Sequence, residues 1–105
     1  MESKLLGSLG LCRKAGKLAA GFDAVKDGIT EKTVGLVLLA SDCSERTVRE
    51  IGRIAGENGI ETVSLPLSMD EIHFTLGKRC GVFGICESGF AKRIEELSAD
   101  SETDF

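Results

Sequence analysis

The sequence contains no tryptophan and no tyrosine, and its aromatic side chains are five phenylalanines and one histidine. Proteins that read single-stranded nucleic acid on an open sheet need exposed aromatic rings there, so we exclude a stacking platform on a sheet. No apolar run approaches the length of a membrane span, and the first residues lead into an amphipathic segment rather than the apolar core of a secretory signal. We therefore expect a cytoplasmic protein with no membrane partner.

The familiar catalytic and metal-binding patterns are also missing. Four cysteines, at positions 12, 43, 80 and 86, show no C-x-x-C spacing, and there is no H-x-x-x-H, Walker A or G-x-G-x-x-G pattern. The only histidine is His73, and its sequence context does not suggest a catalytic triad. We therefore predict reduced thiols, no enzyme activity, no metal and no cofactor.

The net negative charge comes largely from one end of the chain. The 105 residues carry a net charge of −4, but residues 95–105 hold five acidic residues and no basic one. The remaining chain has 12 acidic and 13 basic residues, so a nucleic-acid site would have to be a local basic patch. We predict a single domain over residues 1–97 and an acidic, flexible tail over residues 98–105.

The hydrophobic pattern predicts an α/β protein, a three-layer α/β/α sandwich with a mixed sheet of about four strands. A helix over 3–15 and a short strand over 17–20 come first, and three strand–helix units follow. The expected strands of these units are 34–40, 61–65 and 82–86, and the remaining helices are expected to begin near Gly21, Ser44, Ser68 and Ser88.

Local signals refine these expectations. Ser68–Glu71 is a capping box, and Asn58-Gly59 is a helix stop. Ser3 is expected to cap the first helix, either Asp42 or Ser44 the third, and Ser88 the last. The third helix is expected to turn three apolar residues toward the core and to approach the sheet closely at two glycines: Val48, Ile51 and Ala55, and Gly52 and Gly56.

The most informative run is Val34–Ala40, a short apolar segment that ends abruptly at Ser41-Asp42. A strand buried on both faces has this appearance, and its carboxyl end lies at the sheet edge where α/β proteins tend to bind ligands. Ser41 and Asp42 are therefore candidate binding residues.

Three basic segments are candidates for contact with a polyanion. Arg13–Lys17 is a basic turn before a helix start at Gly21, where free N–H groups favour phosphate, although its first residues also simply complement the dipole of the first helix. Lys78-Arg79 follows Gly77 in a loop and has no acidic neighbour in sequence. A stripe on the third helix is largely neutralised by acidic residues at i,i+4 spacing, which favours a solvated face: Arg46, Arg49 and Arg53.

Seven segments together carry a family resemblance: Leu6-Gly7, Arg13–Lys17, Gly21, Val37–Asp42, Leu76-Gly77, Gly81 and Gly89–Ile94. The chain resembles the ribosomal protein L-seven-Ae family over about residues 4–97, in particular its small bacterial YlxQ-type members. The resemblance implies an α/β/α sandwich that binds kink-turns or related structured RNA. It places the RNA surface at the start of the second helix, the end of the central strand and the loop before the last strand.

The start of the second helix departs from the family pattern. Family members typically carry Gly-x-Asn-Glu-x-x-Lys there, and these side chains read tandem G·A pairs. Here Gly21 is kept, but Asp23, Ala24 and Asp27 stand in place of Asn, Glu and Lys. Loss of several charge-assisted contacts, each of about 1–3 kcal/mol, would weaken kink-turn binding. The loop over 77–81 also looks shortened.

The predicted function is non-catalytic RNA binding in the ribosome or translation system, with altered RNA-reading residues and a possible ribosomal or protein partner. A protein-interaction adaptor that has lost its RNA contacts is the alternative, and the acidic helix start favours it. A thiol or metal site at Cys43 and Cys80 is a third hypothesis, weak because a closed zinc site needs four ligands. The candidate RNA-binding residues are Lys17, Gly21, Phe22, Asp23, Lys26, Ser41, Asp42, Lys78 and Arg79.

Overall fold

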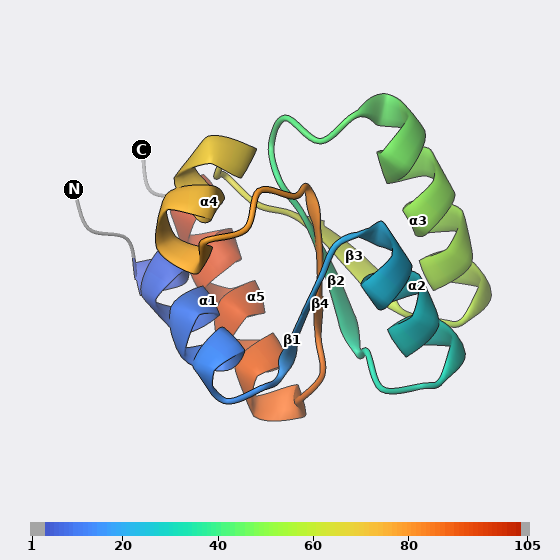
Figure 1. The fold of residues 1–105 in the computed structure, drawn as a ribbon. Coiled ribbons are helices and arrows are strands. Elements are labelled where there is room, and N and C mark those ends of the chain that lie inside the picture. The colour runs from blue at the N-terminus through green and yellow to red at the C-terminus, as the bar shows by residue number, and fades with distance from the viewer. Residues whose placement is uncertain (1–3, 104–105) are drawn as a thin grey trace.

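The computed structural model describes residues 4–103, and its element order follows the predicted helix, short strand and three strand–helix units (Figure 1). No helix in this range is long and apolar enough to cross a membrane. The helices are α1 (Lys4–Lys14), α2 (Phe22–Thr30), α3 (Glu45–Glu57), α4 (Met69–Leu76) and α5 (Ser88–Thr103). The strands are β1 (Leu18–Ala20), β2 (Leu36–Leu39), β3 (Glu61–Ser64) and β4 (Val82–Ile85).

The four strands form one mixed sheet in the order β1-β4-β2-β3. β2 runs parallel to β3 and antiparallel to β4, and β4 is also antiparallel to β1. The ends of β1, β2 and β3 therefore meet the beginning of β4 at one side of the sheet, which we call the Gly21 end. The start of β1 and the end of β4 lie at the other side, which we call the Lys17 end.

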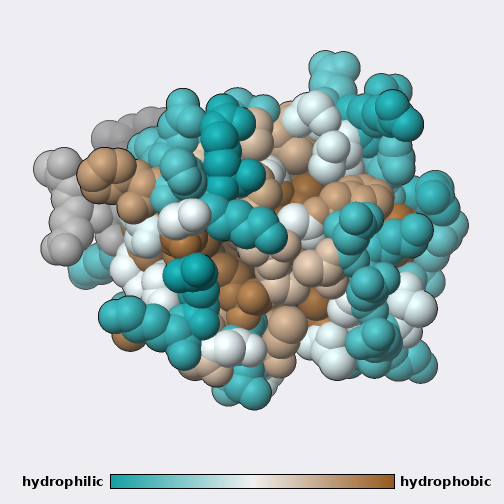
Figure 2. Space-filling model, viewed as in Figure 1, coloured by the Kyte–Doolittle hydropathy of each residue, from teal (hydrophilic) through white to brown (hydrophobic). Residues whose placement is uncertain are grey.

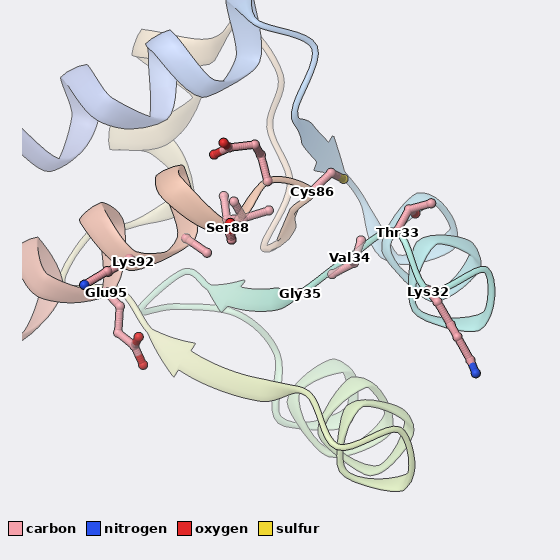
Figure 3. Close-up of a pocket in the computed structure, with 11 residues that line it drawn as sticks. Lys32, Thr33, Val34, Gly35, Cys86, Ser88, Lys92 and Glu95 are labelled. Atoms are coloured by element: carbon pink, nitrogen blue, oxygen red, sulfur yellow. The ribbon is translucent and has the colours of Figure 1, made fainter.

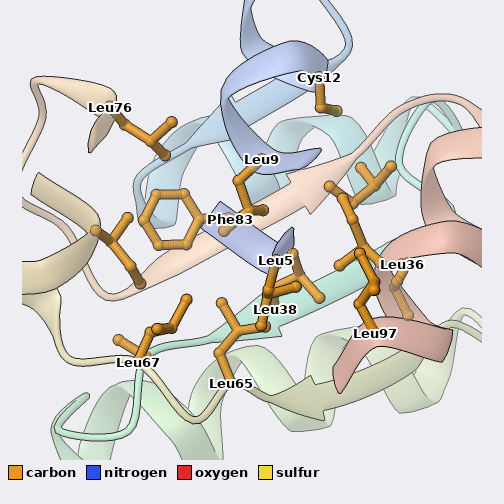
Figure 4. Close-up of a cluster of buried hydrophobic side chains, with 14 residues drawn as sticks. Leu5, Leu9, Cys12, Leu36, Leu38, Leu65, Leu67, Leu76, Phe83 and Leu97 are labelled. Carbon is orange, nitrogen blue, oxygen red and sulfur yellow. The ribbon is translucent and has the colours of Figure 1, made fainter. Parts of the chain in front are cut away.

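Helices cover both faces of the sheet, which confirms the predicted three layers. β2 is buried throughout because its side chains alternate between two cores: Leu36 and Leu38 lie in one, and Val37 and Leu39 in the other. The first core receives side chains from α1, α4 and α5, and the second from α2 and α3. Figure 4 shows Phe83 of β4, which is 0% exposed, lying in the first core near Leu9 and Leu76.

Close packing of α2 depends on two glycines that the sequence analysis did not single out. A Cβ atom added at Gly28 would overlap Cγ2 of Val34, and one added at Gly84 of β4 would lie 2.9 Å from the same methyl. Val34 therefore fills the space that both glycines leave open and joins α2 to the sheet. The predicted close approach at Gly52 and Gly56 is wrong, because an added Cβ at either would find no atom within 4 Å.

Some of the other local predictions are wrong, and others are confirmed. Val48 is 37% exposed and faces outward from α3, whereas Ile51 and Ala55 are buried as predicted. Ser88 does not cap α5 but is its first residue; instead the Glu87 carboxylate accepts a hydrogen bond of 2.7 Å from the N–H of Phe90. The capping box at Ser68 and the left-handed glycine after α3 are confirmed.

The first residues of the expected acidic tail lie in α5. α5 continues past the expected boundary at residue 97 and stays helical to Thr103, and the Ser98 side chain is buried. Residues 104 and 105, and the expected cap at Ser3, lie outside the described residues.

Candidate nucleic-acid interface

Three loops meet at the Gly21 end, and backbone hydrogen bonds hold them in place. The N–H of Gly21 donates to the carbonyl of Val82 at 2.9 Å, and the N–H of Ala40 donates to the carbonyl of Gly81 at 2.9 Å. Ser41, exposed beyond the end of β2, donates its N–H to the carbonyl of Leu67 at 2.8 Å. The start of α2, the end of β2 and the loop before β4 therefore form one continuous, preorganised surface.

The start of α2 depends on a conformation that only glycine adopts readily. Gly21 has φ 100° and ψ 155°, and α2 has no side-chain hydrogen bond at its N-cap. The first N–H groups of the helix, together with the positive end of its dipole, therefore favour an anion. Asp23 is exposed in this first turn and complements the same dipole, while Phe22 is half-buried against the core of α2 and α3.

The loop over 77–81 brings a cation to the start of α2. The Lys78 ammonium donates to the carbonyl of Ala20 at 3.3 Å, and a Cβ added at Gly21 would lie 3.8 Å from the same nitrogen. Lys78 forms no ion pair with any side chain that the structure describes. Its charge is thus free to meet a phosphate at the helix start.

Arg79, in contrast, has an acidic partner. Its Nε lies 3.0 Å from Oδ1 of Asp70 on α4, and both side chains are exposed. An exposed pair of this kind contributes about 0–1 kcal/mol, so the contact orients the guanidinium more than it stabilises the fold. The sequence concealed this partner because Asp70 lies in the preceding helix.

Asp42 has a structural role at this surface. Its Oδ1 accepts a hydrogen bond of 2.8 Å from the N–H of Met69, and so ties the end of β2 to the first turn of α4. The cap of α3 is Ser44, whose hydroxyl accepts from the N–H of Thr47 at 3.3 Å. Of the two predicted capping candidates for α3, Ser44 is therefore the correct one.

Two thiols belong to this region: Cys80 lies in the loop over 77–81, and Cys43 packs against it. A Cβ added at Gly81 would lie 2.9 Å from Sγ of Cys43, so the thiol packs directly against the loop backbone. Burial raises the pKa of the Cys43 thiol, with Asp42 adding to the effect. Burial also raises the pKa of Cys80, although the Lys78 ammonium and the N–H groups of Val82 and Gly21 act in the opposite direction. Both thiols thus stay neutral, and no cluster of three potential metal ligands occurs among residues 4–103.

Not every predicted site residue reaches this surface. The carbonyl of Lys17 accepts from the N–H of Cys86 at 2.8 Å, which places Lys17 at the opposite end of β1. Four extended steps of roughly 3.3 Å each, across the three residues of β1, separate the Cα of Lys17 from that of Gly21 by about 13 Å. Lys26 is exposed on α2, one turn beyond Phe22. The Gly21 end unites the other predicted residues: Gly21, Phe22, Asp23, Ser41, Asp42, Lys78 and Arg79.

A pocket of about 430 Å³ lies at the Lys17 end, between the loop over 32–35 and the start of α5 (Figure 3). Its charged lining is mixed, because Lys92 is accompanied by Glu87 and Glu95. In Figure 3 the Lys32 side chain extends away from α5, so its charge is not directed at the pocket. The pocket therefore lacks the concentration of one charge that would indicate a polyanion site.

Residues 3–98 match the sequence profile of the ribosomal protein L7Ae/L30e/S12e/Gadd45 family. This chain belongs to that family. The RNA-binding protein YlxQ of Enterococcus faecium is 33% identical over 96 residues, which cover 91% of this chain and 92% of that protein. The family match and this relative confirm the resemblance to YlxQ-type members.

Solved structures share the fold of this family member. A protein of unknown function from Bacillus halodurans has a TM-score of 0.86 at 26% identity, covering 93% of this chain and 99% of that one. A Giardia lamblia 15.5kD RNA binding protein has a TM-score of 0.71 at 14% identity, covering 97% of this chain and 91% of its own. The second likeness supports the fold alone.

One prominently exposed residue on α4 was missed. Phe74 on α4 is 94% exposed, although Ile72 and Leu76 on either side of it are buried. The helical period would have predicted this exposure. Each residue of a helix is rotated by about 100° from the previous one, so a residue two positions from two inward-facing residues points about 160–200° away from them. On the face seen in Figure 2, hydrophilic side chains lie over α1 and α4 on the left and over α2 and α3 on the right, with less polar atoms between them.

Proposed function

We propose that this chain is a non-catalytic RNA-binding protein of the translation system, acting in the cytoplasm, and that it contacts structured RNA with the Gly21 end of its sheet. One observation carries the proposal: the Lys78 ammonium is held beside the glycine start of α2 and has no acidic partner among the described side chains. The family membership and the RNA-binding relative from Enterococcus faecium support the same function.

The chemistry of this surface suits a phosphate of the RNA backbone. The first N–H groups of α2 and the Lys78 ammonium both lie at the start of this helix, and a phosphate bound there would accept hydrogen bonds from them. Lys26 adds a second exposed cation along α2. Because backbone atoms supply part of the contact, binding of this kind holds the RNA in place without specifying its sequence.

The side chains that would read bases argue against strong kink-turn selectivity. Asp23, Ala24 and Asp27 are all exposed on α2, where the family pattern has Asn, Glu and Lys. A carboxylate accepts hydrogen bonds but donates none, so Asp23 cannot reproduce the donor of an asparagine amide. We therefore propose RNA binding with weak discrimination for kink-turns.

The same two carboxylates favour the second candidate, a protein-interaction adaptor. Asp23 and Asp27 repel phosphate and attract a basic protein surface. This candidate predicts no measurable RNA affinity even at low salt.

The structure supplies a matched pair of variants for the test. Lys78→Glu and Lys17→Glu make the same charge change at exposed positions, the first at the Gly21 end and the second at the Lys17 end. Fluorescence anisotropy with a kink-turn RNA and a plain duplex, each at low and moderate salt, measures both. We expect Lys78→Glu to weaken binding to both RNAs and to reduce the salt slope by about 1, while Lys17→Glu has a smaller effect. Equal losses would move the site away from the Gly21 end, and no binding by the wild-type chain at low salt would favour the adaptor.

A further inference from the structure

The aromatic ring of Phe74 is almost fully exposed on α4. It is 94% exposed, compared with 61% for Leu11 and 37% for Val48, the other exposed large apolar side chains among the residues whose burial the structure describes. Its helix is anchored without its help, because Ile72 and Leu76 are buried and the capping box at Ser68 closes the first turn. The fold therefore gains nothing from a phenylalanine at this position.

Phe74 has an acidic neighbour on α4, and this neighbour forms an ion pair with an arginine. Asp70 precedes it by one helical turn, and side chains at i,i+4 lie about 5–6 Å apart at their Cβ atoms. Asp70 is also the residue whose Oδ1 lies 3.0 Å from Nε of Arg79, so Phe74 and Arg79 have Asp70 as a common neighbour. The ion pair with Arg79 also offsets the negative charge of this neighbour of Phe74.

The ring is also close in the chain to the proposed phosphate site. Gly77 ends α4 in the left-handed conformation, and Lys78 follows it directly with its ammonium at the start of α2. Phe74, Arg79 and Lys78 thus lie on α4 and on the loop that leads from α4 to the Gly21 end. We call these three residues the α4 path.

We propose that the α4 path binds a single-stranded extension of the RNA, with an unpaired base stacked on the ring of Phe74. The proposal rests on the proposed RNA function and adds to it a second contact outside the start of α2. An exposed aromatic ring beside cations is the arrangement that binds single strands, because every base has a face to stack and every nucleotide has a phosphate to neutralise. A protein partner would instead need a broader apolar patch, and the nearest residues along α4 are polar or charged: Asp70, Glu71, His73 and Thr75.

The absence of tryptophan makes a direct test possible. Phe74→Trp introduces the only tryptophan of the chain, at a position where no packing is disturbed. The RNA probes are one stem-loop in two forms, blunt-ended or with a short single-stranded extension. We expect the extended form to quench the emission of Phe74→Trp through base stacking, and the blunt form to leave it nearly unchanged.

Affinity measurements complete the test. We expect Phe74→Ala and Phe74→Leu to bind the extended RNA roughly 5- to 100-fold more weakly, Phe74→Trp to bind it as well as the wild-type chain, and the blunt RNA not to distinguish the four proteins. Leu11→Ala, which truncates another exposed apolar side chain, serves as the control and should change neither affinity.

The outcomes distinguish a failure of the stacking proposal from a failure of the proposed RNA-binding function. If the wild-type chain binds RNA but neither the emission nor the affinity responds at position 74, the stacking proposal is overturned and the proposed function stands. If Phe74→Leu binds as tightly as the wild-type chain, or Leu11→Ala loses as much as Phe74→Ala, an apolar docking surface replaces the stacking site. If the wild-type chain binds neither RNA, the proposed function fails and the α4 path fails with it.

Discussion

Gly21→Ala tests whether the start of α2 is built on a conformation reserved for glycine. Gly21 has φ 100° and ψ 155°, a region that costs a residue with a Cβ about 1–3 kcal/mol. The cost is conformational and not steric, because the closest atom to the added Cβ would be the Lys78 ammonium at 3.8 Å, an ordinary contact. We expect the free energy of unfolding to fall by about 1–3 kcal/mol, which lowers the Tm by roughly 4–20 °C in a domain of this size.

A matched glycine elsewhere should respond in the opposite direction. Gly52 lies inside α3, and an added Cβ there would find no atom within 4 Å. Gly52→Ala should therefore stabilise the chain by about 0.5–1 kcal/mol, since alanine loses less backbone entropy in a helix. Thermal and urea unfolding followed by far-ultraviolet circular dichroism measures both variants in a chain that has no tryptophan.

The Gly21→Ala variant also tests the RNA-binding surface. A change of φ at residue 21 rotates the first N–H groups of α2 away from Lys78, so Gly21→Ala should lose RNA affinity at temperatures where it is fully folded. A Gly21→Ala variant as stable as the wild-type chain would refute the conformational reasoning. A destabilised variant with unchanged affinity would show that the helix start supports the fold but does not touch the RNA.

Three further changes test other parts of the structure. Asp23→Asn combined with Ala24→Glu and Asp27→Lys should strengthen binding to a standard kink-turn over a plain duplex, and unchanged selectivity in a titration would place the defect in the short loop over 77–81. Gly28→Ala should destabilise by about 1–3 kcal/mol through overlap with Val34, and Val34→Ala in the same chain should recover part of that loss in a double-mutant cycle. Burial raises the pKa of Cys12 from 9.0 to about 11, so between these pH values the folded chain retains a proton that the unfolded chain loses. The free energy of unfolding should therefore fall as the pH rises from about 9 to 11. Urea titrations across this range should show a smaller fall for Cys12→Ala than for the wild-type chain.

The parts of the fold that follow from local chemistry were predictable. A capping box needs only two side chains three residues apart, and the end of α3 at Asn58-Gly59 needs only a glycine in the left-handed conformation. The continuous apolar run of β2 predicted that both faces of this strand are buried, and its side chains do alternate between the two cores. Each of these features is determined within a few residues, so pattern and structure agree.

The errors concern contacts between elements. Gly52 and Gly56 resemble close-packing residues, but the tight contact is made by Gly28 and Gly84 around Val34, which no periodicity indicates. Lys17 precedes Gly21 by only four residues, yet an extended strand between them places the two at opposite ends of the sheet. Distance along the sequence is a poor guide to a site as soon as a strand lies between its members.

The structure also changes how the charges of the site should be counted. Arg79 is paired with the exposed Asp70, and the Asp42 carboxylate binds the N–H of Met69, so each of these charges already has one partner within the protein. The exposed charges that remain on and beside α2 are Lys26 and Lys78 against Asp23 and Asp27, which balance. A balanced surface cannot attract RNA by its net charge, and so affinity has to come from directed contacts: the N–H groups at the start of α2, the Lys78 ammonium bound to the Ala20 carbonyl just before them, and a ring such as Phe74 on which a base can stack.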